Sequence, residues 1–237
     1  MAEAGTGDIV DIGAELERIG VAVRGGNADL RALGFWPVVG RVKRDPALVA
    51  RYADRIGQID RDAFRRGVRI RVPVWVGNTL LVGSIGAGGV AVALAGVVSS
   101  SSVWAGLLVV AAGGIWSVGF HSPTHWVVGR LAGIRFSAYC LRGRPPYPGL
   151  KIDYASYLRA DPGRRAWMHA SGAIGTKVAP FLALAFVPVV DAPGWSAVVL
   201  VAMGLVEIAT DVLLSVKRSD WKRFLRERAV ARAVRAG

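Results

Sequence analysis

The fold is decided by one long uncharged stretch, residues 72–128, which reads VPVWVGNTLLVGSIGAGGVAVALAGVVSSSSVWAGLLVVAAGGIWSVGFHSPTHWVV. It contains no Asp, Glu, Lys or Arg. About 20 apolar residues suffice to cross a hydrocarbon core of about 30 Å. The stretch therefore predicts two membrane-spanning helices, residues 72–97 and 103–130, joined by a short serine-rich connection.

Two further apolar stretches follow toward the C-terminus. Residues 166–190 hold one charge, Lys177, and residues 195–216 hold two, Glu207 and Asp211. Both predict additional spans with polar exceptions that require a reason. We therefore expect an all-α integral membrane protein with about four transmembrane helices. Its predicted parts are an N-terminal region (1–71), a transmembrane domain (72–216) with a loop at 131–165, and a basic tail (217–237).

The positive charges of the chain, whose net charge is +13, indicate its orientation in the membrane. Of the 30 Lys and Arg residues, 13 precede Pro73, eight lie in 130–165, eight follow Val216, and only Lys177 falls within a span. Positive residues are retained on the cytoplasmic side of membranes. We expect both termini and the central loop to be cytoplasmic, in a prokaryotic plasma membrane. The basic faces are expected to contact anionic lipid, and we expect no nucleic-acid binding.

Three cytoplasmic segments have predictable features. Asp45 followed by Pro46 is typical of a helix start, and apolar residues at helical spacing up to Arg66 predict an amphipathic helix. Its apolar stripe is expected on the membrane surface or against the loops, with partner binding as an alternative. Residues 142–149 form a turn-rich, non-helical stretch. The tail is expected to be a basic helix with three apolar residues at the membrane interface: Trp221, Phe224 and Leu225.

Ionisable side chains gather at one depth of the predicted spans. His121, His125 and His169 are all the histidines of the chain, and Glu207 and Asp211 are the acids within the spans. At about 1.5 Å per residue, all five lie roughly 6–15 Å from the cytoplasmic ends of their helices. Ionisable residues in membrane helices favour a functional site, and this matched depth predicts a metal site shared by three helices.

The spacing of these residues suits metal ligands but leaves alternatives open. His121 and His125, like Glu207 and Asp211, are separated by four residues and so share one helical face. Pro123 either bends the helix or, with Ser122 as a cap, begins a new one. The structural alternative to a metal site is a hydrogen-bond or salt-bridge network with Lys177. By depth, Lys177 is better placed to balance Glu207 than to contact Asp211.

Residues 119–134, reading GFHSPTHWVVGRLAGI, are similar to the metal-binding helix of the site-2 protease family of intramembrane zinc metallopeptidases, whose motif is His-Glu-x-x-His. Residues 170–180, ASGAIGTKVAP, resemble the small-residue segment that opens the next core helix of that family. Asp211 occupies the place of the family's third ligand. The resemblance covers residues 103–216 and implies zinc bound by His121, His125 and Asp211, with a membrane peptide as the substrate.

One departure from the family pattern concerns catalysis. The family has a general-base Glu after the first His, whereas this chain has Ser122, and serine does not accept that proton unaided. Val212 also follows Asp211 where glycine is usual. Glu207 is the candidate substitute base or fourth ligand, and His169 is a second-shell or alternative ligand. The competing hypotheses are a catalytically inactive metal-binding homologue and a small metal or ion transporter.

Overall fold

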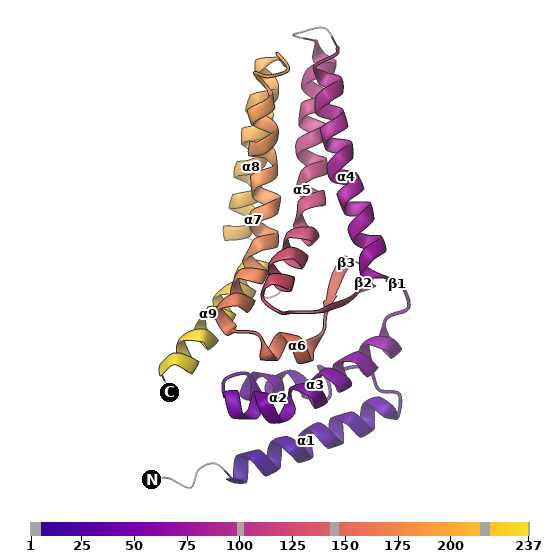
Figure 1. Ribbon diagram of the computed structural model, residues 1–237, viewed down its shortest axis with the longest axis vertical. Helices are drawn as coiled ribbons and strands as arrows, with labels where there is room; N and C mark the ends of the chain where they lie inside the picture. Colours follow the sequence, from indigo (N-terminus) through magenta and orange to yellow (C-terminus); the bar gives the residue numbers. More distant parts are fainter. Residues whose placement is uncertain (1–5, 99–101, 143–146, 214–218, 237) are drawn as a thin grey trace. The chain divides into compact units, whose positions relative to one another are not determined.

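The computed structural model describes residues 6–98, 102–142, 147–213 and 219–236 (Figure 1). Within these residues the chain is mainly helical, as predicted. The elements in chain order are α1 (Thr6–Arg24), α2 (Phe35–Val42), α3 (Pro46–Gly67), β1 (Arg71–Val72), α4 (Val74–Ala95), α5 (Val103–Leu131), β2 (Phe136–Arg142), β3 (Tyr147–Ile152), α6 (Tyr154–Arg159), α7 (Pro162–Phe186), α8 (Gly194–Leu213) and α9 (Asp220–Ala236). Two compact units emerge: residues 1–74, 130–165 and 227–237 form the first, and residues 75–129 and 166–226 form the second.

Helix α3 of the first unit begins where the sequence predicts. The Asp45 side chain accepts hydrogen bonds from the backbone N–H groups of Ala47 and Leu48, at 2.8 and 3.3 Å, and Pro46 occupies the first helical position. These contacts satisfy donors that a helix start otherwise leaves unpaired.

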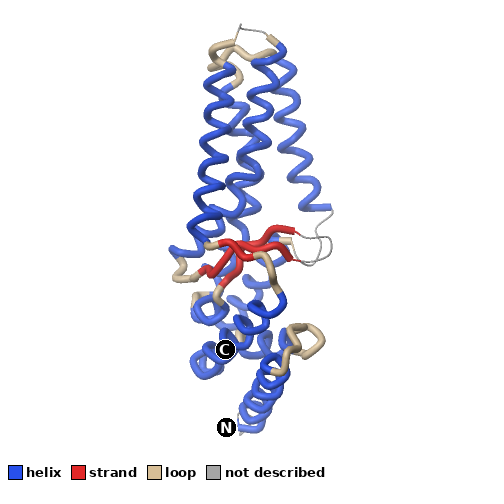
Figure 2. The backbone as a smooth tube through the Cα atoms, turned by 90° about the vertical axis from the view of Figure 1, so that its right-hand side faces the viewer, coloured by secondary structure: helices blue, strands red, loops and turns tan. Residues whose placement is uncertain are grey.

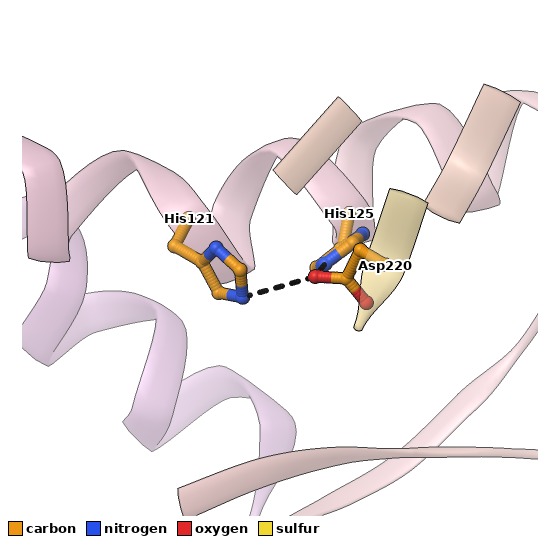
Figure 3. Close-up of side chains that lie close together, drawn as sticks. All are labelled: His121, His125 and Asp220. Atoms are coloured by element: carbon orange, nitrogen blue, oxygen red, sulfur yellow. Dashed lines mark hydrogen bonds and ion pairs between the residues drawn. The ribbon is translucent and has the colours of Figure 1, made fainter. Parts of the chain in front are cut away.

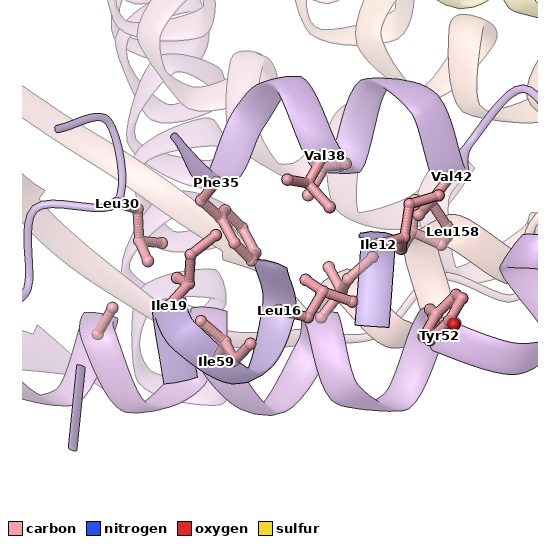
Figure 4. Packing of buried hydrophobic residues seen from close by; sticks show 14 of the residues in the cluster. Ile12, Leu16, Ile19, Leu30, Phe35, Val38, Val42, Tyr52, Ile59 and Leu158 are labelled. Carbon is pink, nitrogen blue, oxygen red and sulfur yellow. The ribbon is translucent and has the colours of Figure 1, made fainter. Parts of the chain in front are cut away.

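The apolar stripe of α3 is buried in the core of the first unit, not spread on a membrane surface as one expectation had it. Tyr52, Ile56 and Ile59 are at most 9% exposed and pack in one cluster with residues of α1, α2 and α6 (Figure 4). Gly57 permits the close approach of α6, because a Cβ atom at Gly57 would lie 2.7 Å from the Cβ of Ala155. The stripe packs mainly against α1 and α2, and it meets the region predicted as a loop through Leu158 and Ala155 of α6.

The region predicted as a loop contains regular structure. Strands β1, β2 and β3 form an antiparallel sheet in that order, with Arg71 opposite Cys140 and Cys140 opposite Gly149. Lys151 of β3 makes a buried ion pair with Asp60 of α3. Part of the turn-rich stretch, residues 143–146, lies outside the described residues.

Helices α4, α5, α7 and α8 run side by side in the second unit (Figures 1 and 2). Three of them, α4, α5 and α8, are long and apolar enough to cross a membrane. Most residues of the apolar segments of α4 and α8 are not buried by the rest of the protein. Only 22% of the α4 segment and 17% of the α8 segment are buried. Such surface suits lipid better than water, as expected of an integral membrane protein.

Close helix packing in this unit depends on small residues, which let membrane helices approach one another. A Cβ atom at Gly88 of α4 would overlap the indole of Trp116 on α5. The indole Nε1–H instead donates to the Ile85 carbonyl at 2.8 Å. Ala179 and Ala183 of α7 are fully buried in the same apolar cluster. Helix α7 thus belongs to the bundle core, while its crossing of the membrane stays a prediction.

The tail forms α9, as predicted, although its aromatic residues are not all placed at a free surface. Phe224 is buried against Ala166 and Ala170 of α7 and contacts the Trp167 ring, with centroids 5.5 Å apart. Trp221 stacks on Phe224 and is 41% exposed. Phe224 therefore attaches the start of α9 to α7.

Candidate metal centre

Helix α5 presents His121 and His125 on one face. The helix continues through Pro123, so no new helix begins at Ser122 and the four-residue spacing keeps its helical meaning. The two imidazole rings lie 4.9 Å apart between centroids, at 87° to each other. The histidine pair predicted from the sequence is thus brought together.

A third side chain, Asp220, meets both histidines (Figure 3). Its Oδ2 atom lies 3.1 Å from Nε2 of His125 and 3.5 Å from Nε2 of His121. Asp220 is the first residue of α9 and is half-buried. One ligand atom from each of the three residues lies within 4.8 Å of the others, and the group can hold a metal ion.

Hydrogen bonds to α7 determine the tautomer of each histidine. Nδ1 of His125 lies 2.6 Å from the carbonyl oxygen of Met168, and because a carbonyl only accepts, this nitrogen must donate its proton. Nδ1 of His121 lies 3.1 Å from Oγ1 of Thr176, whose hydroxyl donates to the Gly172 carbonyl at 3.1 Å. The Thr176 oxygen therefore accepts from His121.

With both protons on Nδ1, both Nε2 atoms of the neutral rings carry lone pairs toward the same carboxylate oxygen. Three acceptors converge without a donor among them, an arrangement that needs a cation or additional protons. A histidine whose other nitrogen donates to a carbonyl or hydroxyl is the common form of a metal ligand. The donor set therefore fits a metal ion.

Close contact between α5 and α7 makes this geometry possible. A Cβ atom at Gly172 would overlap the His125 imidazole, and one at Gly175 would lie 2.9 Å from Oγ1 of Thr124. Gly172 therefore leaves the space that His125 occupies. A small residue is required at this position to seat the ring.

The electrostatics of Asp220 favour its charged form. Burial by itself raises the pKa of this carboxyl group, but when the imidazoles carry the additional protons, the hydrogen bond with His125 and the charges of His125, His121 and Arg223 outweigh that effect. The resulting pKa lies below the usual value of an aspartate. Asp220 is thus held as a carboxylate, the form that binds cations.

A cavity of about 260 Å³ opens beside the group. Helices α5, α7, α8 and the start of α9 contribute its lining, which consists of His121, Ala173, Thr176, Lys177, Glu207, Thr210, Asp211, Ser219 and Asp220. Oε2 of Glu207 is buried and has no hydrogen-bond partner among the described residues. The cavity therefore has Glu207 and Asp211 in the same lining as His121, whereas His125 and His169 are not among its lining residues.

The remaining predicted residues have other neighbours. Asp211 forms an ion pair with Lys177, whose ammonium group also donates to the Ala173 carbonyl at 3.2 Å. The expectation that Lys177 would not contact Asp211 is therefore wrong. His169 is 6% exposed and lies outside the three-residue group. Whether Asp211 or His169 ligates an ion stays a prediction.

Asp220 is the residue that sequence reasoning missed. It follows the last predicted span and was included in a tail described only as basic. The available signal was its position, because Ser219 followed by Asp220 is typical of a helix start and lies close in sequence to the end of the last predicted span. Depths were compared only for residues within the predicted spans, and Asp220 lies beyond the last of them.

No protein-family model, curated protein or solved structure matches this chain.

Proposed function

We propose that this protein is a four-span membrane protein that binds a zinc-type ion through His121, His125 and Asp220 and uses it to hydrolyse a peptide bond at the membrane. The observation that carries the proposal is the convergence of both Nε2 atoms on one Asp220 oxygen, at 3.1 and 3.5 Å. The resemblance to site-2 proteases supports the same reaction class.

The fourth span of this proposal is α7. Its single charge between residues 170 and 186, Lys177, is paired with Asp211 of α8, which lowers the cost of a charge inside a membrane. An even number of spans places both termini on one side. That side then carries 29 of the 30 basic residues, as expected for the cytoplasm.

The distances support zinc. Ligands held at about 2.05 Å around a tetrahedral ion lie about 3.3 Å from one another, which falls between the separations of Oδ2 of Asp220 from the two Nε2 atoms, 3.1 and 3.5 Å. Three protein ligands leave one coordination position, as in catalytic zinc sites. His121 and Asp220 both line the 260 Å³ cavity, so the cavity next to these two residues would have room for water and a substrate carbonyl.

The remaining chemistry falls to the cavity residues. A bound zinc ion supplies Lewis acidity, which polarises a carbonyl and acidifies water. Glu207, whose Oε2 lacks a partner among the described residues, accepts the proton of the attacking water and returns it to the leaving amine. From this cavity Glu207 takes the general-base role of the family's motif glutamate, at whose position this chain has Ser122.

Metal content tests the site. The full chain, purified in detergent, should carry about one zinc ion per molecule by elemental analysis. The H121A/H125A variant should lose it, whereas H169A, which removes the third histidine, should keep it. Absence of stoichiometric metal from the wild type, or its retention in H121A/H125A, would contradict the proposal.

Cleavage tests the activity. E207Q should keep the metal and lose hydrolysis of membrane-peptide substrates, with T210V as a control from the same cavity. If the zinc-loaded wild type cleaves none of a broad peptide panel, the inactive metal-binding alternative is favoured.

The charged pair of Lys177 and Asp211 beside Glu207 favours transport as a second candidate function. Metal-ion flux into liposomes, abolished by K177M, would support that function instead.

A further inference from the structure

The first unit contains a second pocket, of about 330 Å³, that takes no part in the candidate metal centre. Its lining consists of Ala132, Gly133, Arg135, Ser156, Arg159 and Ala160. Two arginines and no acidic residue belong to this lining, and three of its residues have side chains no larger than a methyl group. Its charge and its room both suit an anion.

Both arginines retain donors for a ligand. Nη2 of Arg135 lies 3.5 Å from Oδ2 of Asp153, and Nη2 of Arg159 lies 2.6 Å from Oδ2 of Asp54. Each of these ion pairs uses one nitrogen, whereas a guanidinium offers five N–H donors in a planar fork. That fork matches the geometry of phosphate oxygens.

The pocket lies, along the chain, directly at the end of a helix that can span the membrane. Ala132 follows Leu131, the last residue of α5, and Leu131 is 78% exposed. With its 29 residues, α5 is about 44 Å long, which matches the thickness of a bilayer with its headgroups, about 40–45 Å. Arg135 is four residues further on, at most about 14 Å of extended chain. Ala132 to Arg135 of the pocket are therefore joined by a short length of chain to the end of a helix that can span the membrane.

We propose that Arg135 and Arg159 bind the phosphate group of an anionic membrane phospholipid in this pocket. The two guanidinium groups, the small lining residues and the attachment to the end of α5 together favour a lipid over a free phosphate. The site is independent of metal binding and of hydrolysis.

The test uses the full chain in detergent and measures binding of phosphatidylglycerol and of zwitterionic phosphatidylcholine by native mass spectrometry. The wild type should prefer phosphatidylglycerol. R135Q/R159Q should bind it at least about tenfold more weakly, since charge-assisted hydrogen bonds are lost. R31Q/R44Q is the matched control, because it removes the same charge from two exposed arginines of the same unit and should bind like the wild type.

Several outcomes would overturn the proposal. Unchanged affinity in R135Q/R159Q would exclude the pocket, and an equal loss in R31Q/R44Q would indicate diffuse surface charge. Inorganic phosphate that displaces phosphatidylglycerol at equal concentration would identify a free anion as the ligand. If R135Q/R159Q does not fold, R135K/R159K replaces it as the test variant, because it keeps the positive charges but lacks the planar N–H donors of the guanidinium groups. Wild-type affinity in that variant would likewise contradict the proposed phosphate recognition.

Discussion

Nε2 of His125 lies 3.1 Å from Oδ2 of Asp220, although 95 residues separate the two along the chain. The Met168 carbonyl holds the proton of His125 on the opposite nitrogen, so a lone pair meets a carboxylate unless a metal ion or an additional proton lies between them. This relationship makes Asp220 the proposed third ligand, and three of the following predictions depend on it.

Replacing Asp220 should separate the two candidate acids. D220N removes the charged ligand and should weaken zinc binding by at least about 100-fold, more than the roughly 10–100-fold typical of outer-shell changes. D211N, which removes the partner of Lys177, should change it less than about threefold. Isothermal titration of the metal-free protein measures both. If D211N loses zinc affinity and D220N retains it, Asp211 and not Asp220 is the third ligand.

Thr176 should act on the metal through His121. T176V keeps the shape but removes the oxygen that accepts the His121 Nδ1 proton, so zinc affinity should fall about 10–100-fold. T176S keeps the acceptor and should bind within about threefold of the wild type. Competition with a chromogenic chelator gives the affinities. Equal affinities for the valine and serine variants would show that the hydroxyl does not position the ring.

Gly172 should be needed for the seat of His125. A methyl group there overlaps the imidazole, so G172A should displace the ring and reduce zinc affinity at least about tenfold. G114A is the control, because a Cβ at Gly114 meets nothing within 4 Å. Zinc titration of both variants measures the effect. If G172A binds zinc with wild-type affinity, α7 must shift to accommodate the added methyl group, and the prediction is wrong.

The buried pair of Asp60 and Lys151 should matter through its balance of charge. K151M removes the ion pair of Asp60, which is only 3% exposed, and should lower the free energy of unfolding by about 3–5 kcal/mol. D60L/K151M removes both charges and should recover most of that loss. Denaturant unfolding of the full chain in detergent provides the values. If the double variant is no more stable than K151M, the loss of stability does not come from an unbalanced buried charge.

Tyr157 should make stability depend on alkaline pH. Burial, followed by the charge of Glu227, raises the pKa of the Tyr157 phenol well above its usual value. The folded state therefore keeps a proton that the unfolded state releases near pH 10, so this contribution is complete below about pH 10 and declines above it. Relative to Y157F, the wild type should lose up to about 1.4 kcal/mol per pH unit above that point. Unfolding measured from pH 8 to 11 in both proteins should show this slope, and a constant difference would contradict it.

Local features of the fold could be read from the sequence. The helix start at Asp45 and Pro46 depends on contacts two and three residues away. The shared face of His121 and His125 depends on one helical turn. The burial of the α3 stripe could not be read in this way, because an apolar stripe is equally compatible with lipid and with a protein core. The pairing of β1 with β2 joins segments on either side of α4 and α5, and no local pattern reports it.

The sequence alone predicted four spans, of which three are long and apolar enough to cross a membrane, and a histidine pair at ligand spacing, because the absence of charge and the helical repeat act over one element at a time. Which acid meets those histidines depends on the tertiary structure. Asp211 and Asp220 are nine residues apart and both line the cavity, but Lys177 reaches Asp211 from α7, while α9 brings Asp220 to both Nε2 atoms. That choice depends on how helices pack, and packing is a property of side chains that lie far apart in the chain.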